Sequence, residues 1–84
     1  MQLDLFPTYL HLRCIDPASN KQRFYALSIQ RTLFGEWVFV REWGRIGVSG
    51  RLRSDLYPSA GRAVDALLEL GRQKRRRGYQ AVIS

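Results

Sequence analysis

The residues of this sequence that point most clearly to a binding function are its arginines. Twelve of the 14 basic residues are arginine, and with seven acidic residues they give a formal net charge of +7. A guanidinium group pairs with a phosphate through two parallel hydrogen bonds and also stacks on flat rings. The excess therefore indicates an anionic partner, but it says nothing about the fold.

Four arginines lie close to a tryptophan at alternating positions. If the chain is extended here, Arg41 shares a face with Trp43, and Arg51 shares a face with Arg53. An indole beside guanidinium groups suits a sugar-phosphate chain, because bases and sugars pack on the ring while cations hold the phosphates. The sequence alone leaves an alternative open, in which Trp43 is a core residue and these cations are solvated or pair with nearby carboxylates, namely Glu36, Glu42 or Asp55.

A second group of cations follows the last apolar turn of an expected helix. These are Arg72, Lys74, Arg75, Arg76 and Arg77. Cations also stabilise the C-terminal end of a helix through its dipole, which is the structural alternative. Five cations exceed what such an end needs, so we expect this group to contact phosphates as well.

The sequence lacks the residue combinations that a metal, disulfide, nucleotide-binding or catalytic site needs. His11 and Cys14 are three apart on an expected strand and so lie on opposite faces, and no further His or Cys exists to complete a metal site. Cys14 also has no cysteine partner for a disulfide. The acidic residues show no paired spacing for acid-base chemistry, and the glycines match no nucleotide-binding motif. We therefore predict no enzyme activity, no metal and no cofactor.

The chain length sets the scale of the protein. Eighty-four residues, 45% of them hydrophobic, are sufficient for one domain. No apolar run approaches the roughly 20 residues of a membrane span, and the first residues lack the pattern of a signal peptide. We expect a cytoplasmic protein without membrane contact, in which residues 1–8 form an irregular arm and residues 9–84 form the domain.

The hydrophobic pattern predicts the elements that position these groups. Two-residue alternation over 9–16, and runs of β-branched and aromatic residues over 23–30 and 36–43, predict strands, and a more polar strand is expected over 51–56. Trp37, in the middle of its strand, is expected to pack in the core. Gly44, Gly47 and Gly50 predict a turn, because glycine adopts the positive φ angles of a tight reversal.

A helix is expected to begin after Pro58, with Ser59 as its N-cap. Apolar residues then recur with helical spacing as far as Gly71, so one helix face is expected to cover the sheet. The predicted fold class is therefore α+β: a small twisted antiparallel sheet of about four strands with one helix packed across one face.

The run Trp43-Gly44-Arg45-Ile46-Gly47 resembles the signature of the WGR domain family. The resemblance extends over about residues 9–80 and includes further matching features: Asn20-Lys21, Phe24-Tyr25, Gly50, the helix from Ser59, and the basic segment that ends in Gly78-Tyr79. Members occur in poly(ADP-ribose) polymerases, in bacterial proteins similar to a molybdate metabolism regulator, and as small free-standing bacterial chains, which this one resembles.

In the polymerases the module binds DNA ends. The signature Trp packs against the sugar at a strand terminus, and basic residues hold the neighbouring phosphates. The resemblance thus implies that Trp43 and Arg45 occupy the two signature positions and that Lys21 belongs to the basic set. No catalytic polymerase domain accompanies them in this sequence.

We therefore expect a non-catalytic nucleic-acid-binding module, with DNA a more favoured partner than RNA. No helix carries base-contacting residues at a suitable spacing, so binding should favour a structure, such as an end or a nick, over a sequence. The alternative is an adaptor whose Arg45 and exposed aromatic residues dock an acidic protein partner.

Overall fold

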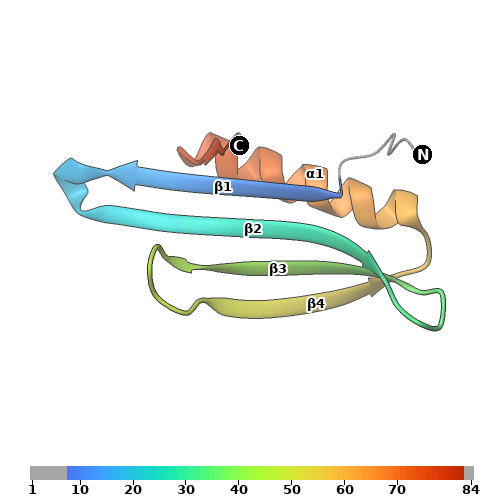
Figure 1. The fold of residues 1–84 in the computed structure, drawn as a ribbon. Helices are drawn as coiled ribbons and strands as arrows, with labels where there is room; N and C mark the ends of the chain where they lie inside the picture. Colours follow the sequence, from blue (N-terminus) through green and yellow to red (C-terminus); the bar gives the residue numbers. More distant parts are fainter. Residues whose placement is uncertain (1–7, 83–84) are drawn as a thin grey trace.

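A computed structural model describes residues 8–82, which form an antiparallel sheet crossed by one helix (Figure 1). The expected arm over residues 1–8 lies outside the described residues except for Thr8. The sheet has the strand order β4-β3-β2-β1-β5. Its elements are β1 (Tyr9–Asp16), the 3-10 turn η1 (Pro17–Ser19), β2 (Lys21–Arg31), β3 (Trp37–Arg45), β4 (Arg51–Tyr57), α1 (Ala60–Arg76) and β5 (Gln80–Ala81).

The predicted α+β class is confirmed, with five strands in place of about four. The added strand, β5, has two residues and pairs with β1 at Leu12 and Arg13. A two-residue strand is too short to produce a hydrophobic period, so the sequence gives no sign of it. Among residues 8–82, no helix is long and apolar enough to cross a membrane.

The turn between β1 and β2 is held by a side chain. The Asp16 carboxylate accepts hydrogen bonds from the Ala18 amide at 3.2 Å and from the Ser19 hydroxyl at 2.7 Å. These hydrogen bonds, with that from Ser19 first, lower the pKa of Asp16 below its ordinary value of 3.8. Asn20 then takes a left-handed conformation, with φ 53°, which returns the chain into β2.

The helix begins as the sequence predicts. The Ser59 hydroxyl accepts a hydrogen bond from the Arg62 amide at 3.2 Å, which satisfies one of the free donors of the first turn. Helical residues Ala63, Val64 and Leu67 pack on sheet residues Leu27, Ile29 and Phe39 to form the core. Trp37 is half-buried and packs against this cluster, as expected.

The strand register determines which side chains share the helix side of the sheet. Tyr25 on β2 pairs with Leu12 on β1 and with Trp43 on β3, and Trp43 pairs with Arg51 on β4. Paired residues project to the same face, so these side chains lie on the side that Leu12 shares with the core. The side chains of Tyr25, Trp43 and Arg51 therefore continue the helix side of the sheet beyond the hydrophobic core.

Candidate functional site

Three aromatic rings form the centre of the candidate site. Tyr25 and Trp43 stack with parallel rings, 5.9 Å between centroids and 8° between planes. Tyr79 meets Tyr25 edge to face, at 5.4 Å and 82°. Such pairs are more favourable than contact area alone predicts, so the half-buried Trp43 ring is held in one orientation while part of it remains accessible.

Lys74 connects the helix to this aromatic cluster. Its Nζ lies 4.4 Å from the centroid of Tyr25 and 6.0 Å from that of Tyr79. The helix runs to Arg76, well past its last apolar turn, and this extension brings the lysine to the sheet. A cation over the faces of two rings is stabilised by their quadrupoles, which keeps a positive charge beside Trp43.

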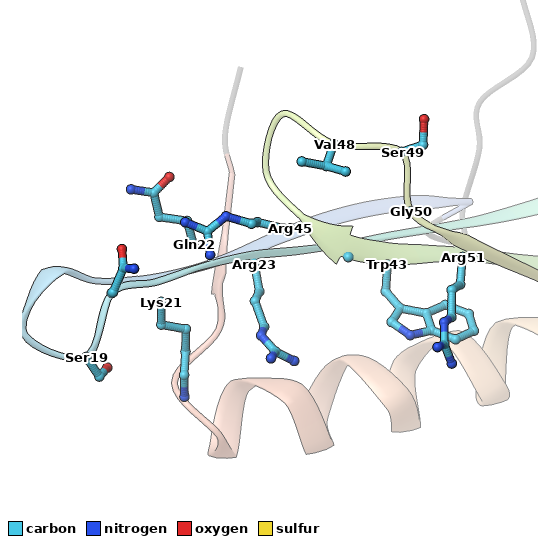
Figure 2. Close-up of a pocket in the computed structure, with 12 residues that line it drawn as sticks. Ser19, Lys21, Gln22, Arg23, Trp43, Arg45, Val48, Ser49, Gly50 and Arg51 are labelled. Carbon is cyan, nitrogen blue, oxygen red and sulfur yellow. The ribbon is translucent and has the colours of Figure 1, made fainter.

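Two adjoining grooves lie beside these rings, and they share Lys21, Arg23, Trp43 and Gly44. The first, the turn groove, has a volume of about 610 Å³ and runs along the β3–β4 turn (Figure 2). The second, the helix-end groove, has a volume of about 440 Å³ and lies toward the end of α1. The turn groove adds Ser19, Asn20, Gln22, Arg45, Val48, Ser49, Gly50 and Arg51, and the helix-end groove adds Tyr25, Lys74, Arg77 and Tyr79.

The side chains that shape the turn groove point in two directions. Figure 2 shows Lys21, Arg23, Trp43 and Arg51 projecting toward the helix side of the sheet, whereas Val48 lies on the other side. The first four share a face through the alternation and pairing of strand residues, whereas Val48 belongs to the β3–β4 turn. On the helix side of the sheet, the turn groove therefore presents three cations, Lys21, Arg23 and Arg51, around one indole.

The grooves are electropositive throughout. None of the described residues that line either groove is acidic. Glu42, although it precedes Trp43, pairs with Ala26 and Leu52 and so projects to the opposite face. Burial is the main cause that raises the pKa of Tyr79, so its hydroxyl stays neutral at physiological pH and adds no negative charge.

The three turn glycines have different functions. Gly47 has a positive φ, 87°, as the sequence predicts. The other two were expected to have positive φ for the same reason, and that expectation is wrong for both. They are needed because β3 and β4 approach closely: a Cβ on Gly50 would lie 2.5 Å from the Trp43 carbonyl oxygen, and one on Gly44 would lie 3.0 Å from Gly50 Cα.

Six of the eleven expected binding residues lie around the grooves. Trp43 and Lys21 line both of them, Arg45 and Arg51 line the turn groove, and Lys74 and Arg77 line the helix-end groove. Three segments that are far apart in the sequence thus form one basic surface around one indole.

Arg41 and Arg53 share the face of Trp43 but are bound to a carboxylate. The Asp55 carboxylate forms ion pairs with Arg41 Nη2 at 3.4 Å and with Arg53 Nε at 3.1 Å. Arg41 is half-buried beside Phe39, and its Nε has no hydrogen-bond partner among residues 8–82. The alternative of pairing with Asp55 therefore holds for these two arginines, which line neither groove.

Three helix cations also lie outside the grooves. Arg72 forms an ion pair with Glu69. Arg76 is five residues beyond buried Gly71, so the helical rotation turns it away from the sheet. Arg75 is exposed but lines neither groove. For these residues the role of stabilising the helix C-terminus is sufficient.

Arg23, Tyr25 and Tyr79 belong to the site and are absent from the expected binding set. Arg23 and Tyr25 lie opposite Arg45 and Trp43 in the β2–β3 register. Tyr79 follows Gly78, whose φ of 96° turns the chain back along β1. The family resemblance includes Tyr25 and Tyr79, but only the structure shows that Tyr25 stacks on Trp43 and that both tyrosine rings contact Lys74.

The surroundings do not suggest a metal site. Within the described stretch, 8–82, no three His, Cys, Asp or Glu side chains gather in a way that could hold a metal ion. His11 packs near Phe24 on the outer face, whereas Cys14 is buried on the inner one. The site therefore has cations, aromatic faces and hydroxyl groups as its chemistry.

Comparisons with known proteins place this geometry in context. A family model described as the WGR domain matches residues 8–83. An uncharacterised protein of Sinorhizobium fredii (strain NBRC 101917 / NGR234), named y4dW, is 42% identical over 74 residues, which cover 88% of this chain. The match covers 36% of that protein, so the chain spans about a third of the length of this curated relative. No solved structure matches.

Proposed function

This chain belongs to the WGR domain family, and from that premise we propose that it is a non-catalytic nucleic-acid-binding module. The match over residues 8–83 confirms the resemblance that begins at Trp43-Gly44-Arg45. Residues 9–84 are the proposed binding domain. The favoured ligand is DNA with an end or a nick, bound with little sequence specificity.

One observation carries the proposal: a half-buried indole, part of it accessible, lies where two grooves without acidic lining residues meet. Lys21 and Arg23 lie in both grooves with Trp43, Arg51 is beside it in the turn groove, and Lys74 is beside it in the helix-end groove. Phosphates are attracted to such a surface because no carboxylate competes for the cations. The indole supplies a flat apolar face for a sugar or a base.

This arrangement favours recognition of a nucleic-acid structure, such as an end or a nick, over recognition of a base sequence. Phosphate contacts fix the position of a nucleic acid but do not read its bases. The Trp43 ring is buried on one side by Tyr25, so it offers a limited area, suited to a group at a strand terminus or a break. Inside an intact duplex the bases are stacked on each other and inaccessible to this ring.

Fluorescence anisotropy with blunt, nicked and closed-circular DNA at two salt concentrations tests the proposal. We expect tighter binding to the ends and nicks, weakened by salt. Trp43→Ala should remove the preference for ends, because the ring that meets the terminus is lost. Micromolar or weaker binding without salt dependence would contradict the proposal.

A matched pair of variants separates the site from general charge. Arg23→Gln and Arg62→Gln remove the same charge, but Arg23 lines both grooves and Arg62 lies exposed near the start of α1. The first should weaken binding about tenfold and the second less than about twofold, because a direct hydrogen-bonded phosphate contact is stronger than the screened attraction of a distant charge. If Trp43→Ala instead retains DNA binding and loses a protein partner, the adaptor alternative is favoured.

A further inference from the structure

Strand β4 forms an edge of the sheet. It pairs with β3 on one side, and no strand among residues 8–82 pairs with its other side. Figure 1 shows β4 at the border of the sheet, with no helix beyond it. An edge of this kind has free N–H and C=O groups that can pair with another strand. Residues Arg51–Tyr57 include neither proline nor glycine, so no residue of this strand interrupts pairing along the edge.

The residue order of β4 is complementary to itself. Antiparallel pairing with a second copy, centred on Ser54, places every other residue opposite a suitable partner. Arg53 faces Asp55 of the second copy, Leu52 faces its Leu56, and Arg51 faces its Tyr57. Opposite charges, apolar pairs and aromatic partners at directly opposed positions all stabilise a sheet.

The charges also select this register over its neighbours. A two-fold axis perpendicular to the sheet keeps the faces of both copies aligned, so the register can change only in steps that centre the pairing on another residue. Centring on Arg53 would place this arginine opposite itself, and centring on Asp55 would do the same for the carboxylate. Like charges directly opposite are destabilising. The Ser54-centred register avoids both and pairs all seven residues.

The exposed side chains of β4 support the same partner. Leu52 and Leu56 are 67% and 63% exposed on the outer face, beside half-buried Val38 and Val40 of β3. Pairing would bring the two leucines of each copy together and extend this apolar strip across the junction. The Arg53 side chain is 60% exposed, so it can reach a second carboxylate in addition to its own Asp55.

We propose that the chain forms a symmetric dimer through antiparallel pairing of β4 with β4 of a second copy. The two sheets become one sheet of ten strands. Because the axis is perpendicular to the sheet, both helices and both pairs of grooves face the same side. The dimer thus presents two identical basic sites to one ligand surface.

Two exposed positions test the pairing without touching the grooves. Sedimentation velocity over a concentration series should show the average mass rising toward twice that of the monomer. Leu52→Glu and Leu56→Lys each place a charge opposite a leucine and should weaken the dimer at least about tenfold. An equimolar mixture of the two variants places Glu opposite Lys in a heterodimer, and dimerisation should return. The double variant should also dimerise.

The unaltered chain supplies a second measurement. Its NMR amide signals for residues 51–57 should shift with concentration, while those of β1 should not. A monomer at every concentration contradicts the proposal, as does a dimer that neither single substitution weakens. A double variant as monomeric as the single ones rules out the Ser54-centred register, provided that its NMR spectrum shows a folded protein.

Discussion

Arg76 and Arg77 are neighbours in the sequence with different positions in the structure. Arg77 follows the end of α1 and lines the helix-end groove with Lys74 and Tyr79. Arg76 is the last helical residue and faces away from the sheet. The two residues contribute the same charge, but only Arg77 lines a groove. This pair therefore tests whether the grooves or the total charge determine binding.

We predict that Arg77→Gln weakens binding to a nicked duplex about threefold to tenfold and reduces the salt slope by about one. Arg76→Gln should change the affinity less than about twofold, because an exposed charge outside the grooves is screened. Anisotropy titrations of both variants at several salt concentrations provide the measurement. Equal losses would mean that general attraction, and not the groove geometry, holds the ligand.

At the scale of elements, the predictions that succeed depend on local chemistry. The Ser59 cap and the stripe through Ala63, Val64 and Leu67 are visible in the sequence, because a helix is built from neighbouring residues. The expected second strand begins two residues later than β2, and the expected third strand ends two residues earlier than β3. The extension that carries Lys21 pairs with Asp16 of β1, and the extension that carries Arg45 pairs with Arg23 of β2, so both depend on strand pairing. Pairing partners are not encoded in a hydrophobic period.

The same reason explains what the sequence could show of the site. Trp43 and its basic neighbours could be singled out from residue type and from the family resemblance. The sequence could not show which cations line the grooves and which are paired with Asp55, because this depends on the β3–β4 register. The stack of Tyr25 on Trp43 likewise depends on the β2–β3 register.

The close approach of β3 and β4 leads to a prediction at Gly50. A Cβ there would meet the Trp43 carbonyl oxygen at 2.5 Å and Phe24 Cζ at 3.0 Å. Gly50→Ala should destabilise the fold by about 1–3 kcal/mol and shift the Trp43 indole NMR signal, because the strands must separate. Urea unfolding and the indole resonances measure both effects.

Gly47→Ala is the control for this substitution. Its Cβ would have no heavy atom within 4 Å, but its φ of 87° strains a residue with a side chain. We expect a loss of about 1 kcal/mol with little change at Trp43. An unchanged indole signal in Gly50→Ala would show that the approach of the strands does not determine the position of Trp43.

The β1–β2 turn should respond to acid. The pKa of Asp16 is lowered in the folded chain, so its ionised form stabilises the turn. This contribution is fully present at a pH above 3.8, the ordinary pKa, and is lost as the pH falls through the pKa of the folded chain. The amide signals of Ala18 and Ser19 should therefore titrate with a midpoint below 3.8. Asp16→Asn should abolish the titration, and a midpoint above 3.8 would contradict the proposed hydrogen bonding.

At the scale of the whole molecule, the basic surface is concentrated at one end of an elongated body. The molecule measures 45 × 24 × 23 Å. The β1–β2 turn, the β3–β4 turn and the C-terminal end of α1 lie at the same end of it (Figure 1), and residues of these segments line both grooves. A ligand bound there contacts a part of the 14 basic residues. The six groove cations are Lys21, Arg23, Arg45, Arg51, Lys74 and Arg77.

The number of groove cations predicts the salt dependence of binding. If each of the six neutralises one phosphate, log K should fall with log salt with a slope of about −5 on duplex DNA. Affinity would then decrease about a thousandfold between roughly 50 and 200 mM salt. A slope near −2 would mean that the grooves engage few phosphates. One steeper than about −9 would require the exposed arginines outside them, so this measurement counts the cations at work independently of any substitution.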